Sequence, residues 1–441
     1  MSRATLPVCE PELESSSATS QTVSPADSTR SPLEHVLARG KLRATLTMLG
    51  PAFVAAVAYV DPGNFATNIQ GGARLGYALL WVVLVANLIA MLVQYLSAKL
   101  GIVTERNLPE LCRELLPRPV SWGLWVQAEV IAMATDVAEF LGAAIGLNLL
   151  FGVPLLIAGL LTGVIAFAIL ELQRRGHRSF ELAIAALLGI VFAGFMYETL
   201  KIGPSVHGSL RGLIPGLGGN DAVYLAVGIV VATVMPHVIY LHSALTNGRM
   251  PVRNDAERRR VLRFQRVDVI IALGLAGLIN MAMLAGAAKL LHTPGLTGIT
   301  TIAAAHAQIG RMVGGGAAIA FAVALLASGV SSSSVGTFAG QVVMSGFIGV
   351  QIPVYVRRAV TMAPALVILA LGVNTTGALV LSQVVLSFGI PFALIPLVVL
   401  TGRRDVMGAH VNGRVTHLAA YGVAAAITAM NLFLIGQQLL G

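Results

Sequence analysis

The chain has 441 residues, of which 56% are hydrophobic and only 11% are charged, and its mean hydropathy is +0.81. Soluble domains average about 25% charged residues, so this composition excludes a soluble globular protein and indicates a polytopic membrane protein surrounded by the lipid bilayer. The formal net charge of +9 would suggest nucleic acid only if it formed a patch on a soluble face, and we expect no nucleic-acid partner.

Residues 1–45 differ in composition from the rest of the chain. They contain "ESSSATSQTVSPADSTRSP", which is rich in Ser, Thr and Pro and has little to bury, so we predict a disordered cytoplasmic tail. The tail lacks the basic and apolar regions of a signal peptide. We therefore interpret residues 46–441 as one transmembrane domain whose first span is an uncleaved anchor.

Apolar stretches of about 20 residues, the length that crosses the hydrocarbon layer, occur eleven times. The predicted spans are 46–70, 76–99, 121–149, 153–171, 180–199, 221–246, 266–290, 312–346, 354–373, 378–401 and 415–438. If the spans alternate in direction, only five of the 29 Lys and Arg residues lie on the second side: Arg74, Lys201, Arg211, Lys289 and Arg311. The positive-inside rule then predicts a cytoplasmic N-terminus and an external C-terminus.

Two of these spans are interrupted by proline next to polar residues. The first is broken at Asp61-Pro62-Gly63-Asn64, and the sixth is broken at Met235-Pro236-His237 within "ATVMPHVIYLHSAL". A single proline is usually only a kink in a membrane helix. Two breaks at matched, oppositely oriented positions indicate an inverted-repeat transporter. The repeats would cover residues 46–200 and 221–401, with 415–438 as an additional helix.

The breaks supply groups that can bind a cation. Proline removes a backbone donor and Gly63 lets the backbone turn freely, so nearby carbonyl groups lose their helical partners. The carbonyls expected to be free are those of Ala58, Tyr59, Ala232 and Thr233.

The side chains at the breaks indicate which cation is bound. Asp61 supplies a negative charge that costs at least about 3 kcal/mol to place in the membrane, and Asn64 adds an oxygen one turn along. Met235 adds a thioether, which is a soft ligand, whereas calcium and magnesium prefer oxygen alone. This mixed set favours a transition metal such as Mn²⁺ or Fe²⁺.

Several titratable groups could carry protons through the same region. Asp61 can release a proton when metal binds, and His237 directly follows Pro236. Asp136 and Glu139 lie three residues apart and so share a helix face, while Glu129 lies about 80° around that helix from Glu139. The remaining candidate is Arg358 in the ninth span, a counter-charge for Asp136 or Glu139 in either a functional or a static ion pair.

Three motifs resemble those of the Nramp family of proton-coupled divalent-metal importers, whose bacterial branch transports manganese. They are "DPGNFATNIQGGARLGY", "MATDVAEFLGAA" and "MPHVIYLHSAL". The resemblance implies the LeuT-type fold, with helices 1 and 6 discontinuous. It also implies a polar proton route through Asp136, Glu139 and Arg358.

The resemblance also implies which residues contact the metal. The principal ligands would be Asp61, Asn64, Met235 and the carbonyl groups of Ala58 and Ala232. In "LVLSQVVLSFG" the family glutamine is Gln383, which joins the metal in some conformations. In "GLINMAML" the corresponding residue is Asn280, near the metal and in contact with it through water.

Three other functions are weighed against this one. His237 and His242 could serve an intramembrane metal hydrolase, but their HxxxxH spacing lacks the glutamate of HExxH; a helix–helix hydrogen bond is an equal reading of His242. A sodium-coupled amino-acid symporter would not need methionine beside a break. A passive cation channel would not need broken helices, and without a Walker A motif we expect no direct use of ATP.

The sequence therefore predicts an all-α membrane protein with eleven transmembrane helices that works as a secondary transporter, not an enzyme. It would import Mn²⁺, and also Fe²⁺, by proton symport and alternating access, with no resident cofactor. We expect it in a bacterial plasma membrane. The sequence carries no indication of oligomeric state, so a monomer is the simplest expectation. The run "RNDAERRRVLRF" is interpreted most simply as a cytoplasmic loop at the lipid headgroups.

Overall fold

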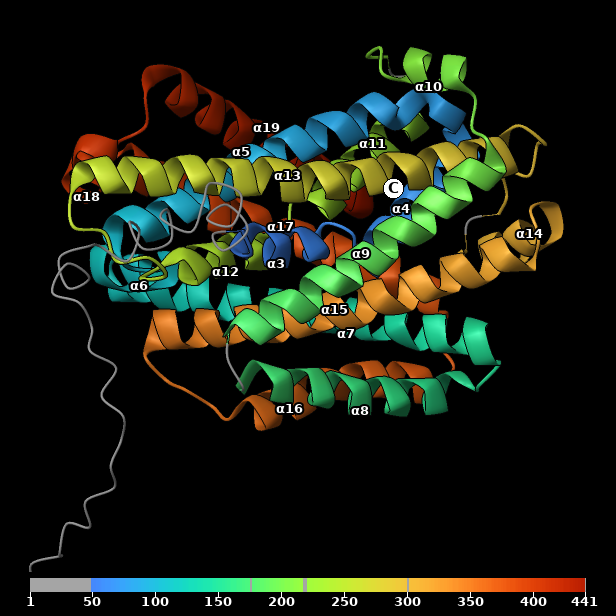
Figure 1. Ribbon diagram of the computed structural model, residues 1–441, viewed down its shortest axis with the longest axis horizontal. Coiled ribbons are helices and arrows are strands. Elements are labelled where there is room, and N and C mark those ends of the chain that lie inside the picture. Colours follow the sequence, from blue (N-terminus) through green and yellow to red (C-terminus); the bar gives the residue numbers. More distant parts are fainter. Residues whose placement is uncertain (1–48, 175–176, 217–219, 300, 441) are drawn as a thin grey trace, which may run out of the picture.

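The computed structural model describes residues 49–174, 177–216, 220–299 and 301–440. The predicted disordered tail at residues 1–45 lies outside the described residues. All regular secondary structure within the described ranges is helical. The long helices run mostly along the longest axis of the molecule, so that their ends gather at its left and right in Figure 1.

Both predicted breaks divide a helix into two pieces. The first interrupted helix consists of α3 (Pro51–Ala58) and α4 (Pro62–Leu75), and the second consists of α11 (Asn220–Thr233) and α12 (Pro236–Thr246). The other long helices are α5 (Leu80–Thr104), α7 (Arg118–Phe151), α8 (Leu155–Arg174), α9 (His177–Ile202), α13 (Asp255–Ala287), α15 (Gly315–Ile348), α16 (Val354–Ala370), α17 (Thr375–Gly402) and α19 (Arg414–Leu440).

Short helical segments connect the long helices at the two ends of the bundle. In Figure 1, α6 (Leu108–Leu115) and α18 (Arg404–Met407) lie at the left end, whereas α10 (Val206–Gly212) and α14 (Ile302–Met312) lie at the right end. The remaining segments are η1 (Gly76–Leu79), the π-helical turn η2 (Ala288–His292) and η3 (Gly408–His410).

Eight helical segments in the described ranges are long and apolar enough to cross a membrane, and Leu155–Ile169 is a shorter apolar helix. Each of the eleven apolar stretches overlaps one long helix or one interrupted helix. The number of membrane crossings and the inverted repeat stay predictions, because length and composition alone do not fix them.

The interpretation of "RNDAERRRVLRF" as a loop is wrong. The helix α13 begins at Asp255, eleven residues before the predicted start of the span, and most of this run forms its first turns. Asn254 caps the helix by accepting a hydrogen bond from the Glu257 backbone N–H at 2.9 Å. Acidic residues in the first turn stabilise the helix by interacting favourably with its dipole. The high charge of these turns conceals them from a search for apolar residues.

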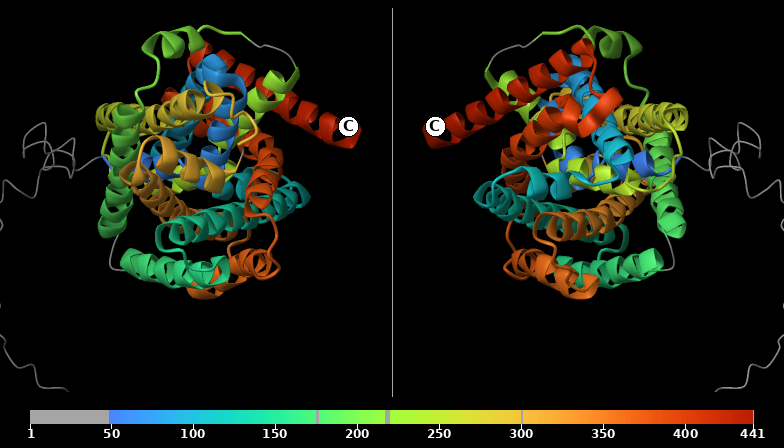
Figure 2. Two further views of the ribbon diagram at one scale, coloured as in Figure 1. Left: turned by 90° about the vertical axis from the view of Figure 1, so that its right-hand side faces the viewer. Right: turned by 90° about the vertical axis from the view of Figure 1, so that its left-hand side faces the viewer.

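The interrupted helices lie inside the bundle, where α3 packs against α9, α12, α13 and α15. The closely packed pair of α7 and α15 runs beside them. The views from the two ends in Figure 2 show α8 and α16 forming a pair at one side, and α19 projecting from the bundle. The breaks are therefore buried among helices from both halves of the chain.

Candidate metal site

The first break is a helix end followed at once by a new helix start. Asp61 has extended backbone angles (φ −74°, ψ 168°) and caps α4, accepting the Asn64 backbone N–H at 2.8 Å. Pro62 occupies the first helical position, where its missing N–H costs nothing. The carbonyl of Ala58, four residues before Pro62, loses the donor that a continuous helix would provide.

The second break has the same backbone form with different side-chain chemistry. Met235 caps α12 in an extended conformation (φ −88°, ψ 118°), again directly before a proline, but no side chain makes a capping hydrogen bond there. Its side chain is buried, with 1% exposed. A thioether is at best a weak acceptor, so Met235 is not needed for the cap and is available as a soft ligand.

Hydrogen bonds join the two breaks and a third helix. The Asn64 side-chain N–H₂ donates to the Asp61 carboxylate at 2.7 Å and to the Ala232 carbonyl, on the second interrupted helix, at 3.3 Å. Gln383 on α17 donates to the other Asp61 oxygen at 3.3 Å. A Cβ atom at Gly63 would lie 1.8 Å from the Gln383 Nε2 atom, so only glycine allows this approach.

Buried oxygens around Asp61 remain without hydrogen-bond partners. Among the described residues, the Asn64 Oδ1 and Gln383 Oε1 atoms have no partner, although such a buried polar atom costs about 1–3 kcal/mol. Together with the Asp61 carboxylate, they form a set of oxygen acceptors that suits a cation. No cluster of three or more His, Cys, Asp or Glu residues that could hold a metal occurs in the described ranges.

The expectation that all four carbonyls at the breaks are free is wrong for two of them. The Tyr59 carbonyl accepts the Asn280 side-chain N–H₂ at 2.7 Å, and the Ala232 carbonyl accepts that of Asn64. Buried backbone groups released by a break are paired with nearby amide side chains because leaving them unpaired is costly. The Asn280 oxygen accepts a bond from Asn68 at 2.8 Å. Its contact with a metal stays a prediction.

The predicted charged residues of α7 form two ion pairs with α16. Asp136 pairs with Arg358 at 3.1 Å, and both side chains are almost fully buried. Arg358 also donates to Ser333 and Thr337 of α15. The partner of Arg358 is thus Asp136 and not Glu139.

The second pair was not predicted. Glu129 binds Arg357 through two hydrogen bonds, at 2.6 and 3.1 Å. Arg357 was not among the predicted site residues, and Arg358 was predicted in the ninth span. They lie in the first turns of α16, with 5% and 0% of their side chains exposed.

Two further titratable groups, Glu139 on α7 and His237 at the second break, have buried atoms without hydrogen-bond partners among the described residues. Neither carboxylate oxygen of Glu139 has a hydrogen-bond partner among the described residues, and its side chain is fully buried. A Cβ atom at Gly336 of α15 would lie 2.7 Å from a Glu139 oxygen and 3.1 Å from an Asp136 oxygen. His237 contacts Thr135 at 3.4 Å through Nδ1, while its Nε2 atom has no partner in the described part of the chain.

A chain of polar side chains that the sequence analysis missed leads from the first break to the start of α3. Gln94 of α5 donates to the Tyr59 hydroxyl at 2.6 Å and contacts His242 Nδ1 through its oxygen at 2.8 Å. Because this oxygen can only accept, His242 carries its proton on Nδ1. Gln265 contacts His242 Nε2 at 3.2 Å. Both ring nitrogens are therefore bonded, which supports the helix–helix hydrogen-bond reading of His242.

This series of polar side chains ends at Asp268, an aspartate of α13 that caps the start of α3. Gln265 donates to Asp268 at 3.2 Å, and Asp268 accepts the backbone N–H groups of Ala52 at 2.9 Å and Gly50 at 3.3 Å. A carboxylate at the first turn of a helix is favoured by the helix dipole. Asp268 of α13 therefore fixes the start of the short helix α3.

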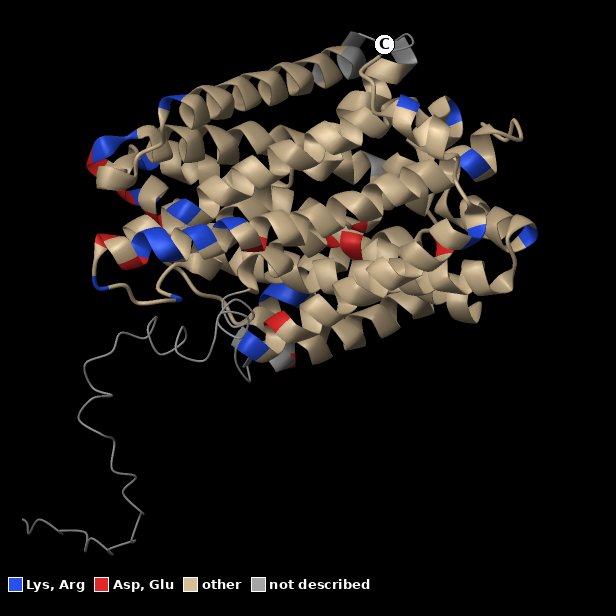
Figure 3. Cartoon of the chain, turned by 45° about the horizontal axis from the view of Figure 1, so that its top comes forward, with Lys and Arg blue, Asp and Glu red and all other residues tan. Residues whose placement is uncertain are grey.

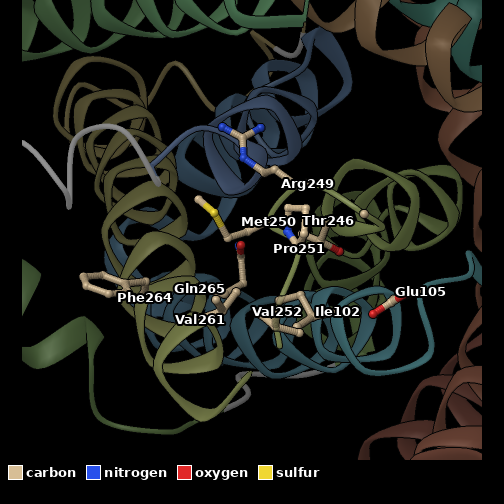
Figure 4. Close-up of a pocket in the computed structure, with 11 residues that line it drawn as sticks. Ile102, Glu105, Thr246, Arg249, Met250, Pro251, Val252, Val261, Phe264 and Gln265 are labelled. Carbon is tan, nitrogen blue, oxygen red and sulfur yellow. The ribbon is translucent and has the colours of Figure 1, made fainter. Parts of the chain in front are cut away.

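A cavity of about 240 Å³ borders this polar chain at the left end of the bundle. It is lined by the end of α5, the loop after α12 and the first turns of α13 (Figure 4). In Figure 4 the Arg249 guanidinium points out of the cavity toward the chain drawn in blue. The guanidinium forms an ion pair with Glu181 of α9.

A helical membrane bundle in which two interrupted helices meet at a buried carboxylate has the architecture of a secondary transporter. Residues 52–437 match the model of the Nramp family, described as natural resistance-associated macrophage protein-like. The chain belongs to the Nramp family, and it is a transporter rather than an enzyme.

Two relatives named "Divalent metal cation transporter MntH" are similar over nearly their whole lengths. The one from Deinococcus radiodurans is 51% identical over 400 residues, 91% of this chain and 92% of that protein. The one from Bacillus subtilis is 51% identical over 414 residues, 93% and 97% of the two chains.

Solved structures agree with this assignment. A crystal structure of the Eremococcus coleocola manganese transporter matches with a TM-score of 0.81 and 32% identity, covering 90% of this chain and 87% of that one. The nucleobase-cation-symport-1 family transporter Mhp1 matches with a TM-score of 0.59 at 16% identity, covering 88% and 89%. The second likeness shows a shared fold alone.

Proposed function

We propose that the protein imports divalent transition-metal ions, Mn²⁺ and also Fe²⁺, together with protons. The observation that carries the proposal is the meeting of the two breaks, where Asn64 joins Asp61 to the Ala232 carbonyl. The substrate ion would bind the Asp61 carboxylate, the oxygens of Asn64 and Gln383, and the Met235 sulfur. The names and high identity of the MntH relatives support this substrate class.

The proposed topology is a LeuT-type inverted repeat of eleven crossings in a bacterial plasma membrane, with the N-terminus cytoplasmic. The basic residues counted along the chain and the separation of α6 and α18 from α10 and α14 support it. A divalent cation entering this way gains about 2.3 kcal/mol per charge for each 100 mV of membrane potential. Alternating access would then expose the buried site to each side in turn.

Protons would move through groups that lack fixed partners. Glu139 and His237 can each take a proton, because both have buried polar atoms that no described side chain occupies. The charges of Asp136 and Arg358 neutralise each other beside Glu139, so the proton route contains no unpaired charge at this point. The second pair, Glu129 with Arg357, continues this polar line along α7 and α16.

The polar chain from Tyr59 to Asp268 would keep the inner gate closed. It ties α3 to α5, α12 and α13 through side chains that are all buried. Release of the metal toward the basic end of the molecule would require α3 to leave these partners. The cost of opening is moderate because each hydrogen bond contributes about 1 kcal/mol.

The test is uptake of radioactive Mn²⁺ by proteoliposomes with an imposed pH gradient, together with a pH-sensitive dye inside the vesicles. We expect saturable uptake that is faster when the outside is acidic, with acidification of the interior and competition by Fe²⁺. Uptake without proton movement would overturn the symport, and sodium-dependent uptake of an amino acid would favour the rival symporter.

A further inference from the structure

The first four turns of α13 carry a row of exposed arginines that the proposed transport mechanism does not use. Arg259, Arg263 and Arg266 are exposed and, with 100° per residue, fall within an arc of about 60° of the helix surface together with Ile270. Figure 3 shows basic bands following one another along the left part of this helix. We call Arg259, Arg263 and Arg266 the arginine row.

The acidic residues nearest to this row are already engaged. Asp255 and Glu105 both form ion pairs with Arg258. The Glu257 carboxylate accepts the Arg253 backbone N–H at 2.8 Å. Within the described ranges, Arg259 and Arg263 form no ion pair. The charge of the row is therefore not neutralised by these neighbours.

The exposed surface beside the row turns apolar immediately after it: Ile270 lies within the arc of the row, and the other apolar side chains lie about 70–110° around the helix from its centre. Val267, Ile270, Ile271 and Leu278 are about half exposed, as expected for side chains that face lipid tails. Arg266 lies at the border, where its guanidinium is 5.0 Å from the centre of the Tyr95 ring and donates to the Tyr95 hydroxyl at 3.2 Å. Tyrosine and arginine at such a border are typical of the headgroup level of a membrane.

We infer that the arginine row is a binding site for anionic phospholipid headgroups. Its charge is complementary to a phosphodiester. Ile270 in the same arc, with Val267 and Ile271 beside it, offers exposed aliphatic side chains to the lipid tails. Clusters of basic residues at the end of a membrane helix attract anionic lipids. Topology alone requires basic residues at this end, but it does not require three of them on one narrow face.

Lipid bound at the row would act on the helix that holds α3. Gln265 precedes Arg266 and points to the opposite side of α13, where it contacts His242 and Asp268. A headgroup that fixes these turns of α13 also fixes the side chain that caps α3. Anionic lipid should therefore alter the opening of the inner gate and the rate of transport.

The experiment compares the variant R259Q/R263Q/R266Q with the control R118Q/R404Q/R414Q. The control removes three exposed arginines from the same end of the molecule but from separate helices. Retention of phosphatidylglycerol is measured by native mass spectrometry, and Mn²⁺ uptake is measured in phosphatidylcholine vesicles with and without phosphatidylglycerol. The melting temperature shows whether each variant is folded. If the glutamine variant is not folded, the variant R259K/R263K/R266K, which keeps the charge, is compared with wild type instead.

We expect the glutamine variant to retain at least about tenfold less phosphatidylglycerol than wild type, and the lysine variant and the control to retain it. Uptake by wild type should rise with phosphatidylglycerol, and this response should disappear only in the glutamine variant. Equal retention by wild type and the glutamine variant would overturn the site.

Two further arms test the identity of the bound group. Displacement of the lipid by millimolar inorganic phosphate would mean that the row recognises free phosphate and would overturn a lipid site. Removal of residues 1–45 should leave lipid retention unchanged. If the row retained lipid only in the truncated protein, the acidic residues of the tail would be its occupant instead. The mass-spectrometric result does not depend on whether the protein transports manganese.

Discussion

The two breaks share the same backbone conformation but differ in their side-chain chemistry. At each, an extended residue stands directly before a proline that begins a new helix. At the first break that residue is Asp61, whose carboxylate caps the helix and accepts bonds from Asn64 and Gln383. At the second it is Met235, which is equally buried and whose side chain makes no capping hydrogen bond.

This difference assigns separate tasks to the two breaks. In the proposed site, the first break would supply the charge that compensates a cation, and Asn64 donates the hydrogen bonds that hold this charge in place. The second would supply an uncharged, polarisable sulfur atom that favours a soft cation over a hard one. Removing the first group should abolish transport of every metal, whereas removing the second should change which metals are transported.

The largest effect is expected for Asp61→Ala. Loss of the only carboxylate among the proposed ligands should reduce Mn²⁺ uptake by at least about 100-fold, on the scale of removing one partner of a buried charged contact. Uptake into proteoliposomes measures this, and Asp405→Ala, which removes an exposed aspartate of α18, is the control. Near-normal uptake by Asp61→Ala would exclude the first break as the charged half of the site.

Glu139→Gln should uncouple protons from metal. The substitution keeps the shape of the side chain but removes its ability to take a proton, so acidification of the vesicles should fall roughly tenfold while Mn²⁺ binding is nearly unchanged. Uptake should also respond less to external acid than in wild type. Glu198→Gln is a matched control, because Glu198 is another buried glutamate with an unpartnered oxygen, on α9. Proton movement in Glu139→Gln as fast as in wild type and in Glu198→Gln would exclude Glu139 from the proton route.

Met235→Ala tests the second break. We expect partial Mn²⁺ uptake but about tenfold weaker discrimination against Ca²⁺, equivalent to about 1.4 kcal/mol, because the remaining oxygen ligands suit a hard cation. Competition of Ca²⁺ against radioactive Mn²⁺ measures the change. Met362→Ala removes an equally large buried side chain from α16 and should leave selectivity intact. If calcium stayed excluded in Met235→Ala, the comparison of the two breaks would fail.

The smallest effect is expected for Asp268→Asn. This change removes the negative charge from the start of α3 and weakens one cap, which costs about 1 kcal/mol. Hydrogen exchange of amides in residues 50–56 should accelerate about fivefold, with uptake altered no more than a few-fold. Unchanged exchange in this segment, with Asp405→Asn as the control, would mean that Asp268 does not hold the gate.

Much of this arrangement follows from sequence because proline and charge inside an apolar stretch are rare and costly. Pro62 and Pro236 were separated from ordinary kinks by their polar neighbours. Pro364, Pro391 and Pro396, which lack such neighbours, lie inside helices that continue past them. Asn64 and Gln383, which the family motifs indicated as ligands together with Asp61, lie within hydrogen-bond distance of Asp61, and the contact of all three with a metal stays a prediction.

The rest could not be predicted because it depends on which buried groups satisfy each other. Gln94, Gln265 and Asp268 lie on two helices and form one chain only after folding. The pairing of Arg357 could not be predicted for the same reason, since its partner Glu129 lies 228 residues away in the sequence. The serines of α15 form further bonds of this kind, since Ser328 donates to the Val60 carbonyl and Ser333 binds Arg358.

The convergence of the two breaks on one ion is tested most directly by manganese X-ray absorption spectroscopy of the purified protein. We predict a sulfur scattering shell around the bound metal in wild type and in Met362→Ala, and its loss in Met235→Ala, while oxygen scattering persists in all three. A spectrum with oxygen and nitrogen scatterers alone in wild type, identical to that of Met235→Ala, would contradict the account.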